Sequence, residues 1–313
     1  MEMTTGPKKI LITGGTGFIG SHLLHELLSN NYSIVLLKRK NSNVWRIKDI
    51  LKKIKIYDVN LNTNFKKILS DESVYAIIHL ATKHIKIHKN SRDIKKMNES
   101  NITFPTLLLD AAVDQNVQFF INTGTFTEYR LKGLISERTP LRPYNYYTAT
   151  KVAFESILNY YVKQNKIKAV TLKLFSPYGE KDTEKIIALL SRSFYDGRKL
   201  DLTQGNQKLC FTHVSDIVEA YLRTLSFFKK SRYKKYETFN IGSNESWSIR
   251  ELVEKLEIIS KKTNCVTFGK KTFLRDDEVD IKCDVRKAKI MLQWQPKVKI
   301  ATGLKKTYSY FAN

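Results

Sequence analysis

A glycine-rich turn between a predicted strand and a predicted helix constrains the fold of this chain most strongly. Residues 11–20, LITGGTGFIG, follow a short apolar run and lead into a segment, 18–29, whose apolar residues recur at helical spacing. Gly15, Gly17 and Gly20 fit G-x-G-x-x-G, while Gly14, Gly17 and Gly20 fit the wider G-x-x-G-x-x-G. Glycines let the backbone turn sharply and approach a pyrophosphate, which helix N-terminal amides then bind. This context favours a Rossmann-type dinucleotide site over a purely structural turn.

Apolar strand patterns and helical patterns alternate through the first half of the chain. We predict helices over 18–29, 62–70, 97–116 and 146–164, and buried strands over 10–13, 34–37, 54–58, 74–80, 119–123 and 169–175. Such an alternation is typical of an α/β fold with a doubly wound parallel sheet.

After residue 175 strand and helix patterns no longer alternate regularly. We predict helices over 183–196, 215–228 and 248–260 and a strand over 209–213. We therefore expect a dinucleotide-binding domain over 1–175, to which 207–232 returns, and a smaller interlaced C-terminal substrate domain over 176–206 and 233–313.

The net charge of +24 raises the question of nucleic-acid binding. The lysines are scattered through nearly every segment, without a long basic block or an aromatic-basic RNA motif. We therefore expect no nucleic-acid partner, and attribute the charge to compositional bias or to the attraction of anionic small molecules.

Sequence patterns also indicate the cellular compartment of the protein and whether it binds a metal. The chain lacks the roughly 20 consecutive apolar residues of a membrane span, and no apolar signal segment precedes the first strand. Its three cysteines lack C-x-x-C spacing, which favours reduced thiols and a cytoplasmic protein. His84 and His88 are four residues apart but have no nearby cysteine or acidic third ligand, so we predict a polar loop and no metal site.

The end of the second predicted strand bears on cofactor choice. An NAD-binding protein usually has an acid there, about 20 residues after the glycine turn. This chain has Lys38, Arg39 and Lys40 instead, with Arg46 nearby. These cations can bind a ribose 2′-phosphate. A solvated strand end is the alternative, but the missing acid favours NADP(H) over NAD(H).

Tyr147 and Lys151 are four residues apart in a predicted helix and so lie on one face of it. The ammonium can lower the pKa of the phenol, which can then give a proton to a carbonyl oxygen. Tyr195 and Lys199 have the same spacing, but Gly197 between them weakens a helix. A hydroxyl partner is expected at the end of the preceding strand, in segment 119–129.

These motifs in this order resemble the extended short-chain dehydrogenases/reductases of the nucleotide-sugar epimerase/dehydratase type. The resemblance covers nearly the whole chain, and includes the run from His213 to Asp216 and a C-terminal segment over 283–296. The family's pattern F-I-x-S-S-S-x-x-x-Y, matched over 120–129, implies that Thr125 carries the active hydroxyl.

The resemblance also implies binding residues. It assigns Ser176 and Arg275 to the substrate, although a surface ion pair explains Arg275 equally well. Leu209 and Cys210 stand where relatives often have Arg-Asp, which removes a phosphate or base contact. For the cofactor it implies Gly14, Gly17, Phe18, Ile19, Gly20, Asp58, Val59, Leu80, Ala81 and Thr82, of which Asp58, Leu80 and Ala81 have equally good structural explanations.

The residues after the active hydroxyl separate reaction types within the family. The 4,6-dehydratases have an Asp-Glu pair there, whereas this chain has Phe126 and Thr127, with Glu128 one position late. The chain most resembles the 4-ketoreductases of deoxysugar pathways, of the CDP-paratose and CDP-abequose synthase type. We therefore expect NADPH-dependent 4-keto reduction of a nucleotide-linked 6-deoxy- or dideoxysugar. A nucleotide-sugar 4-epimerase is the alternative enzyme, and a non-catalytic NADP-binding regulator is an alternative of another class.

The resemblance implies two kinds of partner. One is a nucleotide-diphosphate sugar as substrate. The other is a second copy of the chain, because members often pair the helices that match 97–116 and 146–164 in a homodimer.

Overall fold

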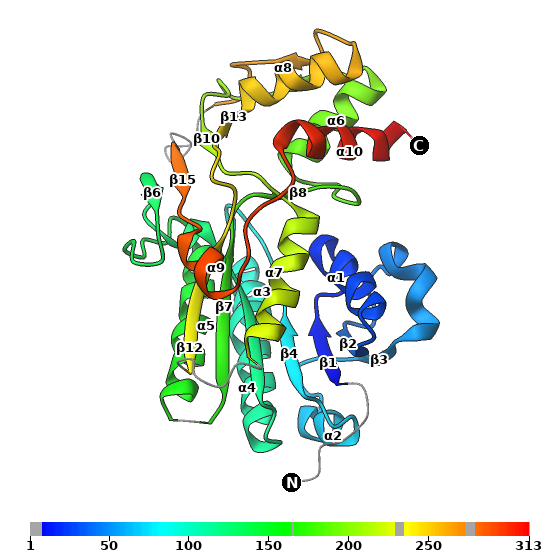
Figure 1. Ribbon diagram of the computed structural model, residues 1–313, viewed down its shortest axis with the longest axis vertical. Helices are drawn as coiled ribbons and strands as arrows, with labels where there is room; N and C mark the ends of the chain where they lie inside the picture. Colours follow the sequence, from blue (N-terminus) through cyan, green and yellow to red (C-terminus); the bar gives the residue numbers. More distant parts are fainter. Residues whose placement is uncertain (1–7, 165, 229–234, 273–278, 313) are drawn as a thin grey trace. The chain divides into compact units, whose positions relative to one another are not determined.

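The computed structural model describes residues 8–164, 166–228, 235–272 and 279–312 (Figure 1). The chain divides into two compact units. The first comprises residues 1–128, 142–173 and 224–239, and the second comprises 129–141, 174–223 and 240–313. Both units are thus assembled from separate stretches of chain, and the domain boundaries expected from the sequence stay a prediction.

A seven-stranded sheet has the order β12-β7-β5-β4-β1-β2-β3. Its neighbours β1 and β2, β1 and β4, β2 and β3, and β4 and β5 pair in parallel. The order is that of a doubly wound Rossmann-type sheet, so the predicted α/β fold class is confirmed. The strands are β1 (Lys9–Thr13), β2 (Ser33–Lys38), β3 (Lys55–Asp58), β4 (Ala76–His79), β5 (Phe119–Thr125), β7 (Lys168–Leu174) and β12 (Tyr236–Ile241).

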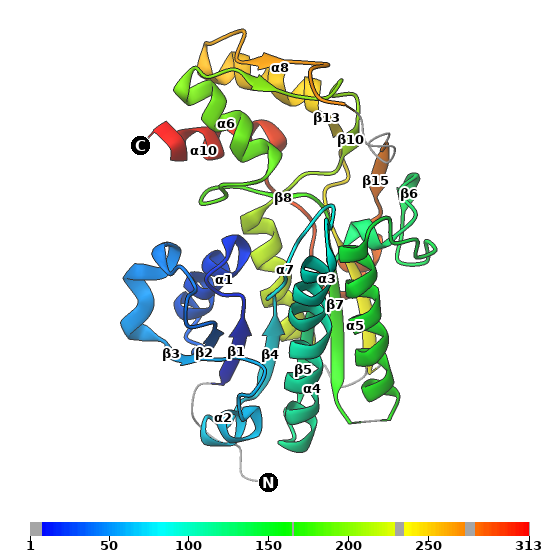
Figure 2. The same cartoon turned by 180° about the vertical axis from the view of Figure 1, so that it is seen from behind.

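Helices cover both faces of this sheet. Figures 1 and 2 show α4 and α5 on one face and α1 on the other. A 3₁₀ turn, Phe126–Glu128, follows β5 directly. The helices of this unit are α1 (Phe18–Ser29), α2 (Phe65–Asp71), α3 (Ser91–Asn98), α4 (Phe104–Asp114) and α5 (Tyr146–Lys163), with a further 3₁₀ segment, Trp45–Lys53.

The single helix expected over 97–116 is interrupted in the structure. A π-helical turn, Glu99–Thr103, separates α3 from α4, and the N–H of Phe104 donates to the carbonyl of Glu99. Pro105 lies at the start of α4 and has no N–H to donate to the carbonyl of Asn101. The proline therefore explains why the regular helical hydrogen bonding fails at this point.

The core of the first unit lies between the sheet and α4 and α5. Buried side chains such as Phe120 of β5 pack in one cluster with Leu108 of α4 and with Phe154 and Leu158 of α5. Burial of an aliphatic or aromatic side chain of this size contributes about 1.5–3 kcal/mol. The apolar face of α5 thus fixes the helix against β5.

In the part of the chain that the structure describes, the second unit contains helices α6 (Ile186–Asp196), α8 (Ile249–Ser260) and α10 (Ile300–Ala312), most of α7 (Val214–Phe227), and four two-stranded sheets. Helix α6 packs on α8 and α10 through Leu190, Leu252 and Leu304. The two-stranded sheets pair β10 (Lys208–Leu209) with β13 (Trp247–Ser248), β11 (Thr212–His213) with β8 (Pro177–Tyr178), β14 (Val266–Thr267) with β9 (Leu200–Asp201), and β15 (Ile281–Cys283) with β6 (Gly133–Ile135). Helix α7 links this unit to the first, and α9 spans Arg286–Met291.

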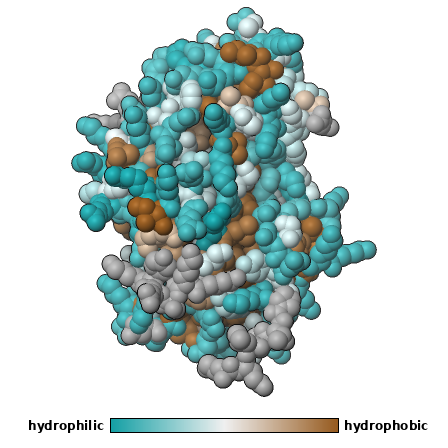
Figure 3. All heavy atoms as spheres, in the orientation of Figure 1, coloured by the Kyte–Doolittle hydropathy of each residue, from teal (hydrophilic) through white to brown (hydrophobic). Residues whose placement is uncertain are grey.

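Figure 3 shows hydrophilic residues over most of the face in view, with apolar residues in separate patches. The most exposed large apolar side chains include Ile258 of α8 and Ile290 of α9, at 80% and 78% exposure. Within the described ranges, no helix is both long and apolar enough to cross a bilayer.

Candidate functional site

The turn between β1 and α1 has a backbone that only glycine fits at two positions. Gly14 has φ +73°, and a Cβ there would lie 2.6 Å from the backbone N of Ala81. A Cβ at Gly20 would lie 2.3 Å from the carbonyl oxygen of Gly14. At Gly15 a Cβ would meet only leucine side chains closely. The tight turn therefore depends on Gly14 and Gly20, the outer glycines of the wider motif.

The N-terminus of α1 fits a phosphate group. Gly17 is the N-cap of the helix and has no side chain to cap its first amides. The N–H of Gly17 donates to the carbonyl of Gly14 at 3.0 Å, which closes the turn. Phe18 and Ile19 form the first turn of the helix. Uncapped helix amides on a glycine turn suit the pyrophosphate of a dinucleotide.

The ends of β2 and β3 bring predicted cofactor residues together. Lys38 and Asp58 are partners in register, and their side chains form an ion pair. Arg39 and Lys40 follow as exposed residues that have no acidic partner in the described part of the chain. Val59 is buried, and its N–H donates to the carbonyl of Lys38 at 2.8 Å.

Arg46, the further cation near this strand end, stacks over a neighbouring ring. Its guanidinium lies 4.3 Å from the centroid of the Trp45 ring, at the start of the 3₁₀ segment. This contact holds the guanidinium against an aromatic face.

A buried histidine holds the end of β4. His79 Nδ1 lies 2.8 Å from the hydroxyl of Thr13, which accepts the N–H of Ala81 at 3.2 Å. Burial, helped by the charge of Lys151, holds the pKa of His79 well below its usual range. The imidazole is therefore neutral, and its hydrogen bond with the Thr13 hydroxyl, together with that from the N–H of Ala81, fixes the segment from Leu80 onward.

Asn101, in the π-helical turn, fixes the next residues of that segment. Its side-chain oxygen accepts the hydroxyl of Thr82 at 3.1 Å and the N–H of Lys83 at 2.7 Å. Its amide donates to the Thr150 hydroxyl on α5 at 2.9 Å. The segment after β4 is thereby tied to the helix that carries Tyr147.

Tyr147 and Lys151 lie one turn apart on α5. The helix begins with a capping box in which Asn145 accepts the N–H of Thr148 at 2.9 Å. Tyr147 is half-buried, and the His84 ring packs edge-on against it with centroids 4.6 Å apart. Lys151 is 4% exposed.

The pKa of the Tyr147 phenol differs in direction from the sequence expectation. Burial raises this pKa, the carboxylate of Glu128 raises it further, and a hydrogen bond with Thr82 opposes them. Burial also lowers the pKa of Lys151, although Glu128 and Glu155 raise it. The lowering of this pKa that the sequence suggested is not found, and the phenol holds its proton firmly.

Thr125 is the last residue of β5 and is half-buried. Its hydroxyl lies 2.9 Å from the hydroxyl of Thr127. Its N–H donates to Oε1 of Glu128 at 2.7 Å. The hydroxyl predicted to be active thus lies where the strand passes into the 3₁₀ turn.

Behind Thr125 lies a buried ionic cluster of Glu128, Lys173 and Glu155. The ammonium of Lys173 lies 2.7 Å from Glu128 and 2.9 Å from Glu155, and the first two side chains are almost fully buried. Glu155 also accepts the Tyr236 hydroxyl at 2.6 Å. Sequence reasoning assigned no role to Lys173 or Glu155, nor to Asn101. Of these three residues, only Glu155 could have been found from the sequence, because it follows Lys151 by one helical turn.

Ser176, one of the predicted substrate residues, lies in the second unit. Ser176 has φ +30°, an unusual backbone for serine, and its carbonyl accepts the N–H of Thr212 at 3.2 Å. Cys210 is fully buried, and its thiol donates to the carbonyl of Ile281 at 3.4 Å. Arg275 lies outside the described residues.

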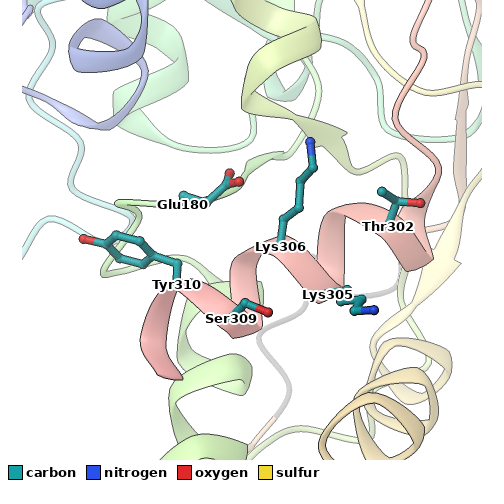
Figure 4. Close-up of a pocket in the computed structure, with 6 residues that line it drawn as sticks. All are labelled: Glu180, Thr302, Lys305, Lys306, Ser309 and Tyr310. Atoms are coloured by element: carbon teal, nitrogen blue, oxygen red, sulfur yellow. The ribbon is translucent and has the colours of Figure 1, made fainter. Parts of the chain in front are cut away.

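A hollow of about 450 Å³ lies on α10 in the second unit, and Glu180, Thr302, Lys305, Lys306, Ser309 and Tyr310 line it. Figure 4 shows the Lys306 side chain extending on the side of α10 where Glu180 lies. None of the predicted site residues lines this hollow. Among the described residues, no group of three or more histidine, cysteine or acidic side chains could hold a metal.

Comparisons with known proteins give relatives over almost the full length. CDP-abequose synthase from Salmonella muenchen is 29% identical over 304 residues, which cover 96% of this chain and 97% of the relative. UDP-glucose 4-epimerase from Lactobacillus helveticus is 26% identical and covers 92% of both chains. The solved structure of UDP-glucuronic acid 4-epimerase from Bacillus cereus, in complex with UDP-glucuronic acid and NAD, is 27% identical, with a TM-score of 0.86 over 97% of this chain and 99% of that one.

A sequence model of the NAD dependent epimerase/dehydratase family matches residues 10–242. This range contains the glycine turn, Thr125, and Tyr147 with Lys151. It also contains the whole of the seven-stranded sheet except Lys9. The match spans well over half of the chain, and the chain belongs to the NAD dependent epimerase/dehydratase family.

Proposed function

We propose that the protein is an NADPH-dependent reductase that reduces the 4-keto group of a nucleotide-linked 6-deoxy- or dideoxysugar. Family membership and the names of the relatives support an enzyme that acts on nucleotide sugars. The observation that carries the choice of a reductase is the end of β2, where Arg39 and Lys40 are exposed and no acid follows the strand. Cations at this place suit a cofactor with a 2′-phosphate.

Tyr147 is the proton donor in this proposal. When bound, the reduced nicotinamide supplies the hydride for the carbonyl carbon. The phenol of Tyr147, whose pKa is raised by burial, keeps its proton until the carbonyl oxygen becomes negative. Thr125 donates a hydrogen bond to the same oxygen, and Lys151, buried one turn after Tyr147, binds the ribose and stabilises the phenolate that remains.

The other predicted residues bind and orient. Gly14, Gly17, Phe18, Ile19 and Gly20 receive the pyrophosphate, and the residues around Asp58, Val59 and Leu80 to Thr82 enclose the nucleoside parts. Ser176 and Arg275 contact the substrate. We also expect a homodimer in the cytoplasm, formed through α4 and α5, where Leu107 and Tyr160 are 40% and 59% exposed.

A nucleotide-sugar 4-epimerase is the second candidate. It is favoured by the likeness to the Bacillus cereus 4-epimerase, at 27% identity and a TM-score of 0.86. An epimerase returns the hydride to its substrate, so it consumes no cofactor. A non-catalytic regulator is the third candidate, and the presence of both Tyr147 and Lys151 opposes it.

Cofactor consumption distinguishes these candidates. With a 4-keto nucleotide sugar as substrate, we expect one NADPH oxidised for each sugar reduced, measured by the loss of NADPH absorbance and by mass spectrometry of the sugar. NADPH that is deuterated at the transferred position should leave one deuterium on C4 of the product. If 4-hydroxy sugars interconvert while added NADPH stays reduced, the protein is an epimerase. If neither reaction occurs while NADPH binds, the regulator is the better description.

A further inference from the structure

Glu128 is a fully buried carboxylate that contacts the backbone of Thr125, the residue with the proposed active hydroxyl. Its side chain is 0% exposed and lies in the 3₁₀ turn that follows β5. Oε1 accepts the N–H of Thr125 at 2.7 Å, and Oε2 accepts the ammonium of Lys173 at 2.7 Å. A buried carboxylate is costly unless such partners satisfy it. Each oxygen of Glu128 therefore has a defined partner, which leaves the side chain one position.

The chain makes room for this carboxylate with a glycine. A Cβ at Gly124 would lie 3.0 Å from Oε1 of Glu128 and 3.1 Å from Cγ of Lys173. These distances are tighter than usual Cβ contacts. The missing side chain at Gly124 lets Glu128 and Lys173 pack directly against the end of β5.

Lys173 is itself held from the other side. Glu155 lies 2.9 Å from its ammonium and accepts the Tyr236 hydroxyl, which lies 2.9 Å from the Thr171 hydroxyl. Hydrogen bonds and the ion pair of Lys173 with Glu155 thus run from β12 and α5 through Lys173 to Glu128 and the N–H of Thr125. Only the last contact reaches the proposed site.

We propose that Glu128 is a positioning residue, which holds the end of β5 through the N–H of Thr125 and so presents the Thr125 hydroxyl to the substrate carbonyl. This role rests on the proposed function, in which Thr125 donates a hydrogen bond to that carbonyl. Glu128 also acts electrostatically on Tyr147, the second group of the site, since its carboxylate raises the pKa of the phenol.

The positioning depends on pH. Burial raises the pKa of Glu128 to about 7, and Glu155 adds to this effect while Lys173 opposes it. The ionised carboxylate accepts both of its hydrogen bonds fully, whereas the protonated form has one weakened acceptor. The titratable groups that face Glu128 or its partners are Lys173 on β7, Glu155, Lys151 and Tyr147 on α5, and Tyr236 on β12.

The first experiment needs no substrate. In the full-length protein labelled with ¹⁵N-threonine, the Thr125 amide resonance is assigned from its loss in Thr125→Ser and followed from about pH 5.5 to about pH 9. We expect this amide to titrate with a midpoint near the pKa of Glu128, about 7. In Glu128→Gln the amide should not titrate. A resonance that is flat in the wild type, or that titrates equally in Glu128→Gln, overturns the proposal.

The second experiment measures turnover. In Glu128→Gln we expect kcat with the 4-keto sugar to fall about tenfold or more, with KM for NADPH unchanged. The rise of kcat with pH through about 7 should disappear in this variant. If Glu128→Gln keeps the kcat and the pH profile of the wild type, the proposal is wrong.

Glu137→Gln is the matched control. Glu137 is a partly buried carboxylate whose pKa burial likewise raises, and it accepts the N–H of Asn240 at 2.8 Å instead of that of Thr125. We expect this control to keep the wild-type kcat and the Thr125 titration. Gly124→Ala, which displaces Glu128 without removing its charge, should lower kcat even if Glu128→Gln does not fold. A wild type without turnover would contradict the proposed function, while the titration of Thr125 would still decide the contact with Glu128.

Discussion

The ammonium of Lys38 pairs with the carboxylate of Asp58, where the neighbouring strands β2 and β3 end in register. The sequence suggested separate cofactor roles for these two residues. In the structure the Lys38 side chain is only 14% exposed, and its charge is compensated by a direct acidic partner. We therefore propose that the next two residues, Arg39 and Lys40, and not Lys38, select a cofactor with a 2′-phosphate.

We expect Arg39→Ala to weaken NADPH binding about tenfold or more, because each lost charge-assisted contact costs on the order of 1.5–3 kcal/mol. Lys38→Ala should have a smaller effect, since Asp58 already neutralises Lys38. NADH binding should barely change in either variant. Titration calorimetry with both cofactors measures these affinities, and Lys52→Ala, at an exposed residue of the 3₁₀ segment, is the control. Equal affinity of the wild type for NADPH and NADH would refute the choice of cofactor.

We expect Tyr147→Phe to lower kcat by roughly 10²–10⁴-fold while the cofactor still binds, because the variant has lost only its proton donor. Tyr195→Phe is the matched control. Helix α6 ends at Asp196 with Gly197 in the left-handed conformation, so Tyr195 and Lys199 do not share a helix face. Steady-state kinetics of both variants test this assignment. A large loss in Tyr195→Phe with a silent Tyr147→Phe would move the active pair to the second unit.

The sequence predicted those strands and helices whose apolar pattern lies within one short segment. Six strands of the central sheet were found as continuous apolar runs, and α1 spans the predicted residues 18–29. The edge strand β12 was missed because its residues, YETFNI, mix apolar and polar side chains. Its place in the sheet comes from pairing with β7, a tertiary contact that leaves no periodic pattern in the sequence.

In the candidate site, too, the sequence predicted features that lie within a short segment and missed those that depend on tertiary contacts. Turn geometry and helical spacing single out the glycine motif and the pair Tyr147 and Lys151 from short segments. The contact between Glu128 and Lys173 joins residues 45 positions apart, and that between Asn101 and Thr150 joins residues 49 positions apart. Charged and amide side chains are usually solvated, so no rule of spacing predicts that these are buried together. The fold supplies that information.

We expect Gly14→Ala to abolish measurable cofactor binding and to lower the melting temperature. The new Cβ would have φ +73° and would lie 2.6 Å from the backbone of Ala81, so the turn must open. Gly133→Ala is the matched control, because Gly133 has φ +65° but nothing within 4 Å of the added Cβ. That variant should show only the left-handed strain of about 1–2 kcal/mol, with cofactor binding intact. Equal effects of the two substitutions would show that close approach to the segment after β4 does not matter.

The stability of the protein should depend on Glu128 in a defined pH window. Its pKa is raised from an ordinary value of 4.5 to about 7 in the folded state, chiefly by burial, so folding favours the protonated carboxyl. The resulting stabilisation is complete below about pH 4.5 and is lost as the pH rises through about 7. Glu128→Gln cannot ionise, so its free energy of unfolding relative to the wild type should increase between about pH 5 and pH 8, by on the order of 3 kcal/mol.

Other groups do not produce this difference. Lys173 holds the pKa of Glu155 below its usual range despite burial, so the contribution of Glu155 changes only at lower pH. Buried His79 is neutral in the folded state and becomes protonated only in the unfolded chain. This happens in both proteins, so its contribution to the difference in unfolding free energy cancels. Urea denaturation at several pH values gives the two curves. The curves should diverge between about pH 5 and pH 8 and stay a constant distance apart above that range, because only the wild type must ionise the buried carboxyl that accepts the N–H of Thr125. A difference that stays constant with pH would show that Glu128 has an ordinary pKa, and that its contact with Thr125 does not change near neutral pH.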